Sequence, residues 1–274
     1  MKERPTIGNL FDLEKTVTSI CNPNFLSMNQ EKSLADAMEL MVKKPRGKLF
    51  LEQSNQLTGI LTFLDILDAL GGGRKHSVYK KYRKSPGMKL ERIMSKPLYL
   101  MEDTSIEKAF YALRRFDTGS LPIVDKGKKI TGVLSGWEFV KNIKGRTGVT
   151  AAEAMTSKPL VSKKDYTLYE TAKMMCRGAY KNFPVTEKGI LVGSISPFLI
   201  VNHLHGKSRA NYLQTEKTKI GSIMDITVPS IPPGADMSEA IREMRANGVR
   251  PVFVTEDREL KGIITKRDLL EVIS

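Results

Sequence analysis

The sequence predicts a mixed α/β (α+β) protein built from four copies of one β-α-β-β-α unit, paired into two modules that form a flat, disc-like array. Three features of the 274 residues indicate this fold: four amphipathic helices, four short strands at a fixed distance behind them, and four glycines after those strands. A single unit of this size buries its apolar faces poorly, so neighbouring units must share a core.

Each unit contains a helix with apolar residues at i, i+3, i+4 and i+7, the pattern of one buried face. The four faces are Leu34, Ala37, Met38 and Met41; Ile106, Ala109, Phe110 and Leu113; Leu168, Thr171, Ala172 and Met175; and Met237, Ala240, Ile241 and Met244. Thr104 with Glu107, and Thr167 with Glu170, predict capping boxes at two of the helix starts.

Strands follow each helix at a constant spacing. Sixteen residues after each helix start, a short strand centres on Phe50, Pro122, Pro184 or Phe253. Nine or ten residues later, Gly59, Gly132, Gly193 or Gly262 opens a second strand. A second helix comes next, such as Lys266 to Ile273 in the last unit. Because the four copies agree at three positions to within one residue, an internal repeat explains the spacing better than chance.

These positions divide the chain into repeats and connectors. We expect an N-terminal segment at 1–16, repeat one at 17–73, a basic linker at 74–91, repeat two at 92–145, repeat three at 150–206, a linker at 207–219, and repeat four at 220–274. Repeats one and two are expected to pair, and likewise repeats three and four.

The formal net charge of +14 indicates anionic partners, such as nucleotide phosphates, nucleic acid or an acidic protein. The two cysteines, Cys21 and Cys176, fit no metal-ligand spacing and favour a reduced, intracellular setting. No secretory signal and no run of about 20 apolar residues is found, so the sequence predicts a cytoplasmic protein without a membrane partner.

One motif recurs after the second strand: glycine, two apolar residues, Thr or Ser, two variable residues and an acid. Repeat one carries it in full from Gly59 to Asp65, and repeat four from Gly262 to Asp268. Repeat two carries a weaker copy of the motif, with Ser135 at the hydroxyl position and Glu138 at the acid position. In repeat three Ser196 is followed by Leu199, and the acid is lost.

On these motifs the chain resembles the CBS domain family from about Val17 to Ile273, as two Bateman modules of two repeats each. In repeat count it resembles the regulatory gamma subunit of AMP-activated protein kinase. CBS modules commonly hold AMP, ADP, ATP or S-adenosylmethionine in clefts between paired repeats. The resemblance implies that Asp65 and Asp268 accept hydrogen bonds from ribose hydroxyls and that Thr62 and Thr265 contact ribose or phosphate. The weaker copies of the motif add Ser135, Glu138 and Ser196.

Further candidates for phosphate or base contacts are Lys48, Lys181, Arg250, Arg267, Ser27 and Ser230. The first three are basic residues that fall just before the first of the two antiparallel strands, where they would complement phosphate charge. Family members often carry a hydroxyl residue in the strand before the first helix, near the adenine pocket. Ser27 and Ser230 occupy that position in repeats one and four. How the repeats pair decides which of these strands serves which acid.

The Thr and Asp pairs also fit simple capping boxes that need no ligand. The leading functional hypothesis is a non-catalytic sensor of an adenine nucleotide, or of an S-adenosylmethionine-type ligand, that an unidentified protein target reads. The alternative is nucleic-acid binding through the basic linker, where Tyr79 and Tyr82 are interleaved with cations. No nucleophile, general base, metal site or catalytic cofactor motif is found, so we expect no enzyme. A homodimer stays open, because four repeats can complete the array within one chain.

Overall fold

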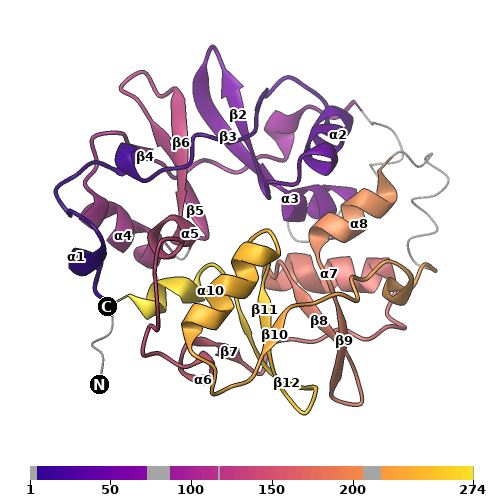
Figure 1. Cartoon of the computed structure of the whole chain (residues 1–274). Coiled ribbons are helices and arrows are strands. Elements are labelled where there is room, and N and C mark those ends of the chain that lie inside the picture. Colours follow the sequence, from indigo (N-terminus) through magenta and orange to yellow (C-terminus); the bar gives the residue numbers. More distant parts are fainter. Residues whose placement is uncertain (1–4, 73–86, 117, 206–216, 274) are drawn as a thin grey trace.

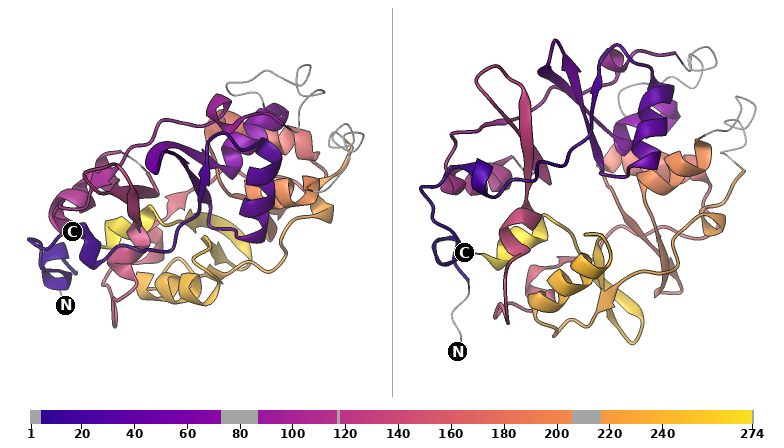
Figure 2. Two further views of the ribbon diagram at one scale, coloured as in Figure 1. Left: turned by 90° about the horizontal axis from the view of Figure 1, so that it is seen from above. Right: turned by 45° about the horizontal axis from the view of Figure 1, so that its top comes forward.

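The computed structural model describes residues 5–72, 87–116, 118–205 and 217–273. Most of the predicted basic linker, with Tyr79 and Tyr82, and most of the second linker lie outside these residues. The four repeats surround a common centre, with repeats one and two in the upper half of Figure 1 and repeats three and four in the lower half. Figure 2 shows the same array from above and from an intermediate angle.

The repeats share one succession of elements. Repeat one comprises β1 (Ser27–Asn29), α2 (Leu34–Lys43), β2 (Lys48–Gln53), β3 (Gln56–Thr62) and α3 (Phe63–Leu67). Repeat two comprises β4 (Leu100–Met101), α4 (Ile106–Arg115), β5 (Ser120–Val124), β6 (Ile130–Ser135) and α5 (Gly136–Val140). Repeat three comprises α7 (Leu168–Gly178), β8 (Phe183–Glu187), β9 (Ile190–Ile195) and α8 (Pro197–Leu204). Repeat four comprises β10 (Ser230–Ile231), α10 (Met237–Ala246), β11 (Val252–Glu256), β12 (Glu259–Ile264) and the 3-10 helix η7 (Asp268–Val272).

Shorter elements precede or connect the repeats. They are α1 (Ile7–Leu10), η1 (Val17–Ser19), the π-helical turn η2 (Asp68–Gly72), η4 (Leu90–Arg92), α6 (Ala151–Ala154), β7 (Thr156–Ser157) and η6 (Ile220–Ser222).

The predicted positions occupy equivalent places in the four sheets. Phe50, Pro122, Pro184 and Phe253 pair with Ile60, Val133, Ser194 and Ile263, the residues that directly follow the four glycines. The strand before the first helix runs parallel to the next strand in repeats one, two and four. In repeat three it is reduced to a single parallel bridge between Ser162 and Val185. All sixteen predicted helix-face residues, Thr171 included, are buried.

Three details of the sequence prediction are wrong. The glycines lie inside the second strands rather than at their starts, because each strand begins two or three residues earlier. The last helix is the 3-10 helix η7, shorter than Lys266 to Ile273. The capping box at Thr104 is absent because α4 begins one residue later and Ser105 caps it, accepting from the Lys108 backbone N–H at 3.4 Å. The box of Thr167 and Glu170 is confirmed.

Paired repeats exchange the segments that precede their first strands. We call these residues, 21–26, 94–99, 155–160 and 224–229, the leading segments. Ser95 of repeat two bridges Ile60 of repeat one, and Asn22 of repeat one bridges Val133 of repeat two. In the second pair, β7 lies along β12, and Asp225 bridges Ser194. This reciprocal exchange joins repeat one to two and repeat three to four.

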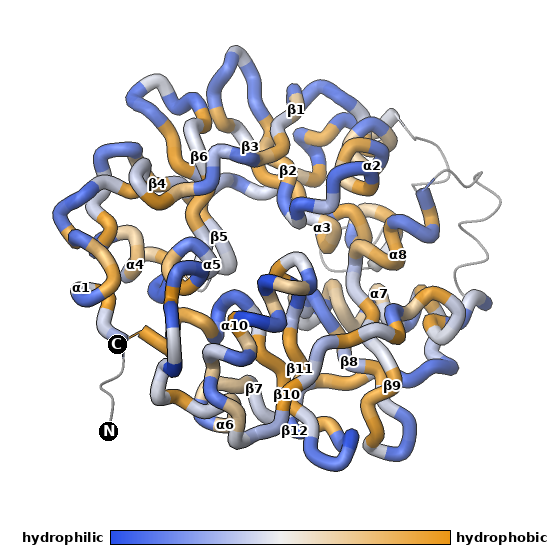
Figure 3. Tube along the Cα trace, in the orientation of Figure 1, coloured by the Kyte–Doolittle hydropathy of each residue, from blue (hydrophilic) through white to orange (hydrophobic). Residues whose placement is uncertain are grey.

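The two large apolar cores cross these pairs. One core contains mainly residues of repeats one and three, and the other contains mainly residues of repeats two and four, together with Ile7 from the N-terminal segment and Val17 at the start of repeat one. In the first core the rings of Phe63 and Phe198 meet edge to face with centroids 5.3 Å apart. Figure 3 shows the apolar parts of α3, α7 and α8 gathered on one side of the array. Each repeat therefore contacts one neighbour through leading segments and another through helices.

Candidate ligand-binding site

The Thr/Ser and acid pairs form capping boxes in repeats one and two, and in repeat four Thr265 and Asp268 make the same side-chain contacts without capping η7. Asp65 Oδ2 accepts from the Thr62 backbone N–H at 2.8 Å and from its hydroxyl at 2.6 Å. Asp268 Oδ2 accepts the same two bonds from Thr265, both at 2.6 Å. Glu138 Oε2 accepts from the Ser135 backbone N–H at 2.8 Å and from its hydroxyl at 2.5 Å. In each of these three acids, one carboxylate oxygen therefore accepts hydrogen bonds from the Thr or Ser of its own motif.

The second carboxylate oxygen distinguishes these acids. Asp268 Oδ1 accepts from the Thr156 hydroxyl at 3.3 Å, a contact from the leading segment of the paired repeat. For Asp65 Oδ1, the part of the chain that the structure describes offers no hydrogen-bond donor. Glu138 is only 5% exposed, so its side chain does not point to solvent. Of the two complete motifs, repeat one thus keeps more acceptor capacity at its acid.

A leading segment of the paired repeat lies beside each strand that contains a motif glycine. Asn22, Ser95, Thr156 and Asp225 all occupy the same register, each opposite the residue that follows a motif glycine. The leading segment of repeat two therefore accompanies the acid of repeat one, and the leading segment of repeat three accompanies the acid of repeat four. This arrangement depends on the exchange between paired repeats, which the sequence left open.

Repeat three departs from this arrangement. Ser196 caps α8 by accepting from the Leu199 backbone N–H at 3.4 Å, and Leu199 brings no carboxylate. A carboxylate comes instead from Asp225 in the leading segment of repeat four, and it forms an ion pair with Arg250. Arg250, a predicted phosphate contact, is thus already paired with an acid of its own chain.

The positive charge of Lys181 in repeat three acts on one lysine of repeat one and one lysine of repeat four. Burial, followed by the positive charge of Lys181, lowers the pKa of Lys48 to about 8, while the charge of Asp65 opposes the shift. Burial also lowers the pKa of Lys266, with Glu138 raising it and Lys181 lowering it further. The Lys266 side chain is nevertheless exposed, so protein surrounds it without excluding solvent. Lys48, Lys181 and Lys266 form what we call the lysine cluster.

Lys48 also links the first pair of repeats directly. It faces Thr62 across β2 and β3, and its Nζ donates to the Ser120 carbonyl oxygen of repeat two at 2.7 Å. The cluster and Asp65 therefore lie where repeats one and two meet. Sequence reasoning selected Lys48 and Lys181 but missed Lys266, which occupies a variable position of the motif. Only the packing of repeat four against the other repeats places it here.

Two of the remaining candidates hold equivalent positions in repeats one and four. Ser27 and Ser230 stand opposite Phe50 and Phe253 in parallel strands, which places both at the predicted position of the first strand. Arg267 directly precedes η7 and is exposed. The surface has one hollow on α4 and one on α7, and no candidate residue lines either of them. Among residues 5–72, 87–116, 118–205 and 217–273, no helix combines the length and apolar character needed to cross a bilayer.

Four β-α-β-β-α repeats, exchanging leading segments in pairs and carrying a Thr/Ser and acid motif, define a class of tandem-repeat modules. The sequence profile described as CBS domain matches residues 17–72, 90–145 and 220–274. The chain belongs to the CBS domain family. Repeat three lies outside the matched residues, in keeping with its lost acid and reduced first strand.

Archaeal proteins resemble the chain over most of its length. The uncharacterised protein MJ1225 of Methanocaldococcus jannaschii is 24% identical over 234 residues, 80% of this chain and 83% of that protein. An uncharacterised 33.4 kDa protein in a ribosomal RNA operon of Thermofilum pendens is 21% identical over 258 residues, 87% of this chain and 85% of that protein.

Solved structures share the fold. The crystal structure of MJ1225 aligns with a TM-score of 0.86 at 21% identity, covering 94% of this chain and 99% of that one. A conserved uncharacterised protein of Pyrococcus horikoshii aligns with a TM-score of 0.57 at 15% identity, covering 95% and 100%. At these identities the likeness establishes the fold alone.

Proposed function

We propose that this chain is a non-catalytic regulatory protein that binds AMP, ADP or ATP between paired CBS repeats and signals its occupancy to a partner protein. The observation that carries the proposal is the lysine cluster beside Asp65. Burial, together with the positive charge of Lys181, lowers the pKa of both Lys48 and Lys266, while the carboxylates of Asp65 and Glu138 oppose these shifts. Like charges brought together in partly desolvated surroundings are unfavourable unless an anion joins them.

A phosphate group meets the chemical demand of the cluster. It is an anion with several acceptor oxygens, and lysine ammonium groups offer three donors each and no acceptor. S-adenosylmethionine, the alternative adenosyl ligand, carries a positive sulfonium that the same lysines would repel. The charge at this position therefore favours a nucleotide over a sulfonium ligand.

Asp65 supplies the complementary contact for the ribose. Its Oδ2 is held by Thr62, which fixes the carboxylate, and its Oδ1 has acceptor capacity left. A ribose diol offers two O–H donors, and an ionised carboxylate only accepts. We assign the first nucleotide to Asp65 with Lys48, and further nucleotides to Glu138 and Asp268. Repeat three, where Leu199 replaces the acid, is assigned none.

The arrangement of the repeats supports a regulatory role. The lysine cluster draws on repeats one, three and four, which meet through both kinds of interface described above. A ligand that contacts several repeats shifts their relative placement only by its difference in affinity for the alternatives. The MJ1225 structure is described as that of a proposed archaeal homologue of g-AMPK, and we extend that regulatory class to this chain.

Calorimetric titration with AMP, ADP, ATP and S-adenosylmethionine tests the proposal on wild type, Asp65→Ala and a matched control, Asp36→Ala. Asp36 caps α2 with the same geometry, accepting from the Ser33 backbone N–H at 2.9 Å and from its hydroxyl at 2.7 Å, but belongs to no candidate site. Both variants lose a cap, worth about 1 kcal/mol of stability. We expect only Asp65→Ala to weaken nucleotide binding, by about tenfold or more. Equal affinities in all three proteins, or no binding to wild type, would reduce the motif to a cap.

A further inference from the structure

Helix α4 carries an exposed surface of aromatic and basic side chains that nucleotide binding does not use. Tyr111 is 57% exposed and Phe116 is 46% exposed, which is unusual for two neighbouring aromatic rings on one helix. Together with Lys108, Ala112, Arg114 and Arg115 they line a hollow of about 860 Å³. We call these side chains the α4 surface.

The Tyr111 ring of this surface packs against a buried ring beneath it. Tyr111 meets the buried Phe110 ring edge to face, with centroids 5.6 Å apart. Arg114 lies over the same Phe110 ring at 5.7 Å and forms an ion pair with Glu271 at 3.2 Å. A fixed ring loses little conformational freedom when a partner covers it, so the surface is already arranged for contact.

Lys108 and Arg115 supply positive charge that the surface itself does not neutralise. Within the described residues, neither side chain forms an ion pair. In the corresponding helices of repeats one and four, a cation pairs along the helix: Lys43 with Glu39 at 2.6 Å, and Arg242 with Glu239 at 3.8 Å. Neither α2 nor α10 contains an aromatic residue.

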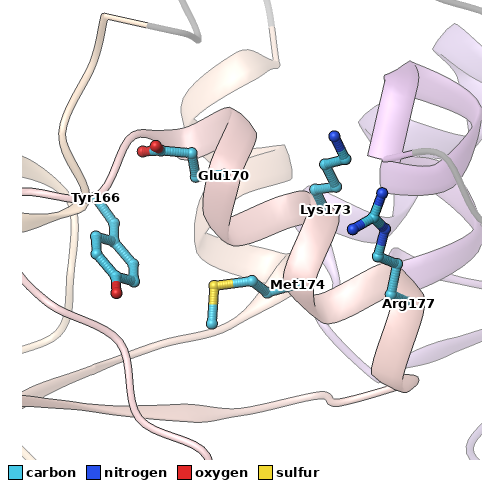
Figure 4. A pocket seen from close by; sticks show the side chains of 5 residues that line it. All are labelled: Tyr166, Glu170, Lys173, Met174 and Arg177. Atoms are coloured by element: carbon cyan, nitrogen blue, oxygen red, sulfur yellow. The ribbon is translucent and has the colours of Figure 1, made fainter.

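A second hollow of similar character lies on α7. It measures about 340 Å³ and is lined by Tyr166, Glu170, Lys173, Met174 and Arg177. Figure 4 shows Tyr166 and Met174 on one side of it and the cations Lys173 and Arg177 on the other. In Figure 1, α4 and α7 lie toward the back of the molecule, whereas α2 and α10 lie toward the viewer. The two hollows on α4 and α7 thus combine aromatic rings with cations, whereas α2 and α10 carry no aromatic residue.

We propose that the face bearing α4 and α7 docks an acidic segment of a partner protein that also presents apolar side chains. Tyr, Phe, Met and Arg are the residues enriched at protein interfaces and at their energetic centres, and they dominate both hollows. The cations select an acidic partner by charge complementarity. The exposed rings beside these cations offer contacts to apolar side chains as well as to acids, which favours a protein segment, and binding of nucleic acid instead is an outcome that the test distinguishes. The inference rests on the proposed function only in that a regulatory protein requires a partner.

Fluorescence anisotropy with three labelled probes tests the surface on the full-length protein. The probes are a short peptide of Asp and Glu residues with interspersed Leu and Phe, the same peptide with Lys in place of the acids, and an oligouridylate. The test variant combines Tyr111→Ala with Arg115→Glu, both at exposed positions. The control, Arg242→Glu, makes the same charge change on α10. Thermal melting confirms that both variants are folded.

We expect the acidic peptide to bind wild type and Arg242→Glu alike, and to bind the test variant about tenfold more weakly. The lysine-containing peptide should not bind. Preferential binding of oligouridylate, lost in the test variant, would replace the protein segment by single-stranded nucleic acid and overturn the inference. Equal binding of the acidic peptide to all three proteins, or none, would also overturn it. Calorimetry with AMP on the same samples separates the two proposals, because the test variant should retain nucleotide affinity.

Discussion

Gly59 in β3 lies directly against Met94, the first residue of the leading segment that repeat two contributes to repeat one. A Cβ atom at position 59 would stand 2.3 Å from Met94 Sδ and 2.9 Å from its Cγ. The equivalent glycines meet the same element of their paired repeats: Gly262 faces Met155, Gly193 faces Met224 and Asp225, and Gly132 faces Cys21. The motif glycine therefore recurs because the partner's leading segment occupies the space of a side chain.

Gly59→Ala should destabilise the protein, because the added methyl group displaces Met94 from the interface. We expect a loss of about 1–3 kcal/mol in the free energy of unfolding. Gly119→Ala serves as the control, since no atom lies within 4 Å of a Cβ at that position. Met94→Ala in the Gly59→Ala background should restore part of the loss, which a double-mutant cycle from urea titrations measures. A purely additive cycle would mean that the two residues do not share this contact.

Asp236 ties the connection between the two pairs to repeat four, and its removal should be costly. Its carboxylate is 6% exposed and accepts from the backbone N–H groups of Thr147, Gly148 and Ser238, each at 2.9 Å. Burial alone would raise the pKa of Asp236, but these hydrogen bonds lower it below its ordinary value. Asp236→Asn should therefore lose about 2 kcal/mol or more of stability at neutral pH.

The pH dependence of that loss follows from the lowered pKa of Asp236. The stability that the carboxylate contributes is present above its unfolded pKa of about 4 and is lost as the pH falls toward the folded value. Chemical denaturation of wild type and Asp236→Asn should thus show a gap that is constant near neutral pH and narrows below about pH 4. A gap that widens in acid would contradict this assignment.

Lys48 should make the stability of the ligand-free protein depend on alkaline pH. Its pKa is lowered to about 8 in the folded chain, compared with about 10.4 in an unfolded one. The destabilisation is complete below the folded pKa, so the free energy of unfolding should rise as the pH increases from about 8 to 10. Lys48→Met should flatten this rise, and saturating nucleotide should suppress it. Nucleotide affinity should fall over the same range, because the neutral amine no longer attracts phosphate.

Lys266 and Arg250 should differ in their effect on nucleotide binding, although sequence reasoning selected only Arg250. Lys266 belongs to the lysine cluster, whereas Arg250 is paired with Asp225. Calorimetry should show weaker nucleotide binding for Lys266→Ala and an affinity within about twofold of wild type for Arg250→Ala. The reverse order would move the phosphate position to the pair of repeats three and four.

The regular features of the fold could be predicted because they are local in sequence. Helix faces such as Leu34 to Met41 follow a fixed period, and the positions of Phe50 and Gly59 recur at a fixed spacing. The cores that cross the pairs could not be predicted, because α3 and α8 show only that each has an apolar face and not which face it meets. The same holds for Thr156, whose contact with Asp268 arises from the exchange of leading segments.

Within the candidate site, sequence predicted positions better than it predicted contacts. Thr62 with Asp65 forms the capping box that the motif indicates, whereas Thr265 bonds to Asp268 without capping η7, and the roles of both pairs toward a ligand stay predictions. In repeat three the sequence itself indicated the missing ribose contact, because Leu199 stands at the position of the acid. No sequence signal pointed to Asp225 as the partner of Arg250, because that ion pair joins a leading segment to a residue just before β11, 25 residues away.

A crystal structure of the chain with the adenine nucleotide that binds most tightly in calorimetry tests the central claim most directly. We predict the ribose hydroxyls on Asp65, the phosphate groups beside Lys48, Lys181 and Lys266, and no nucleotide at Leu199. A nucleotide bound away from the lysine cluster, or density for one beside Leu199 with none at Asp65, would contradict the account.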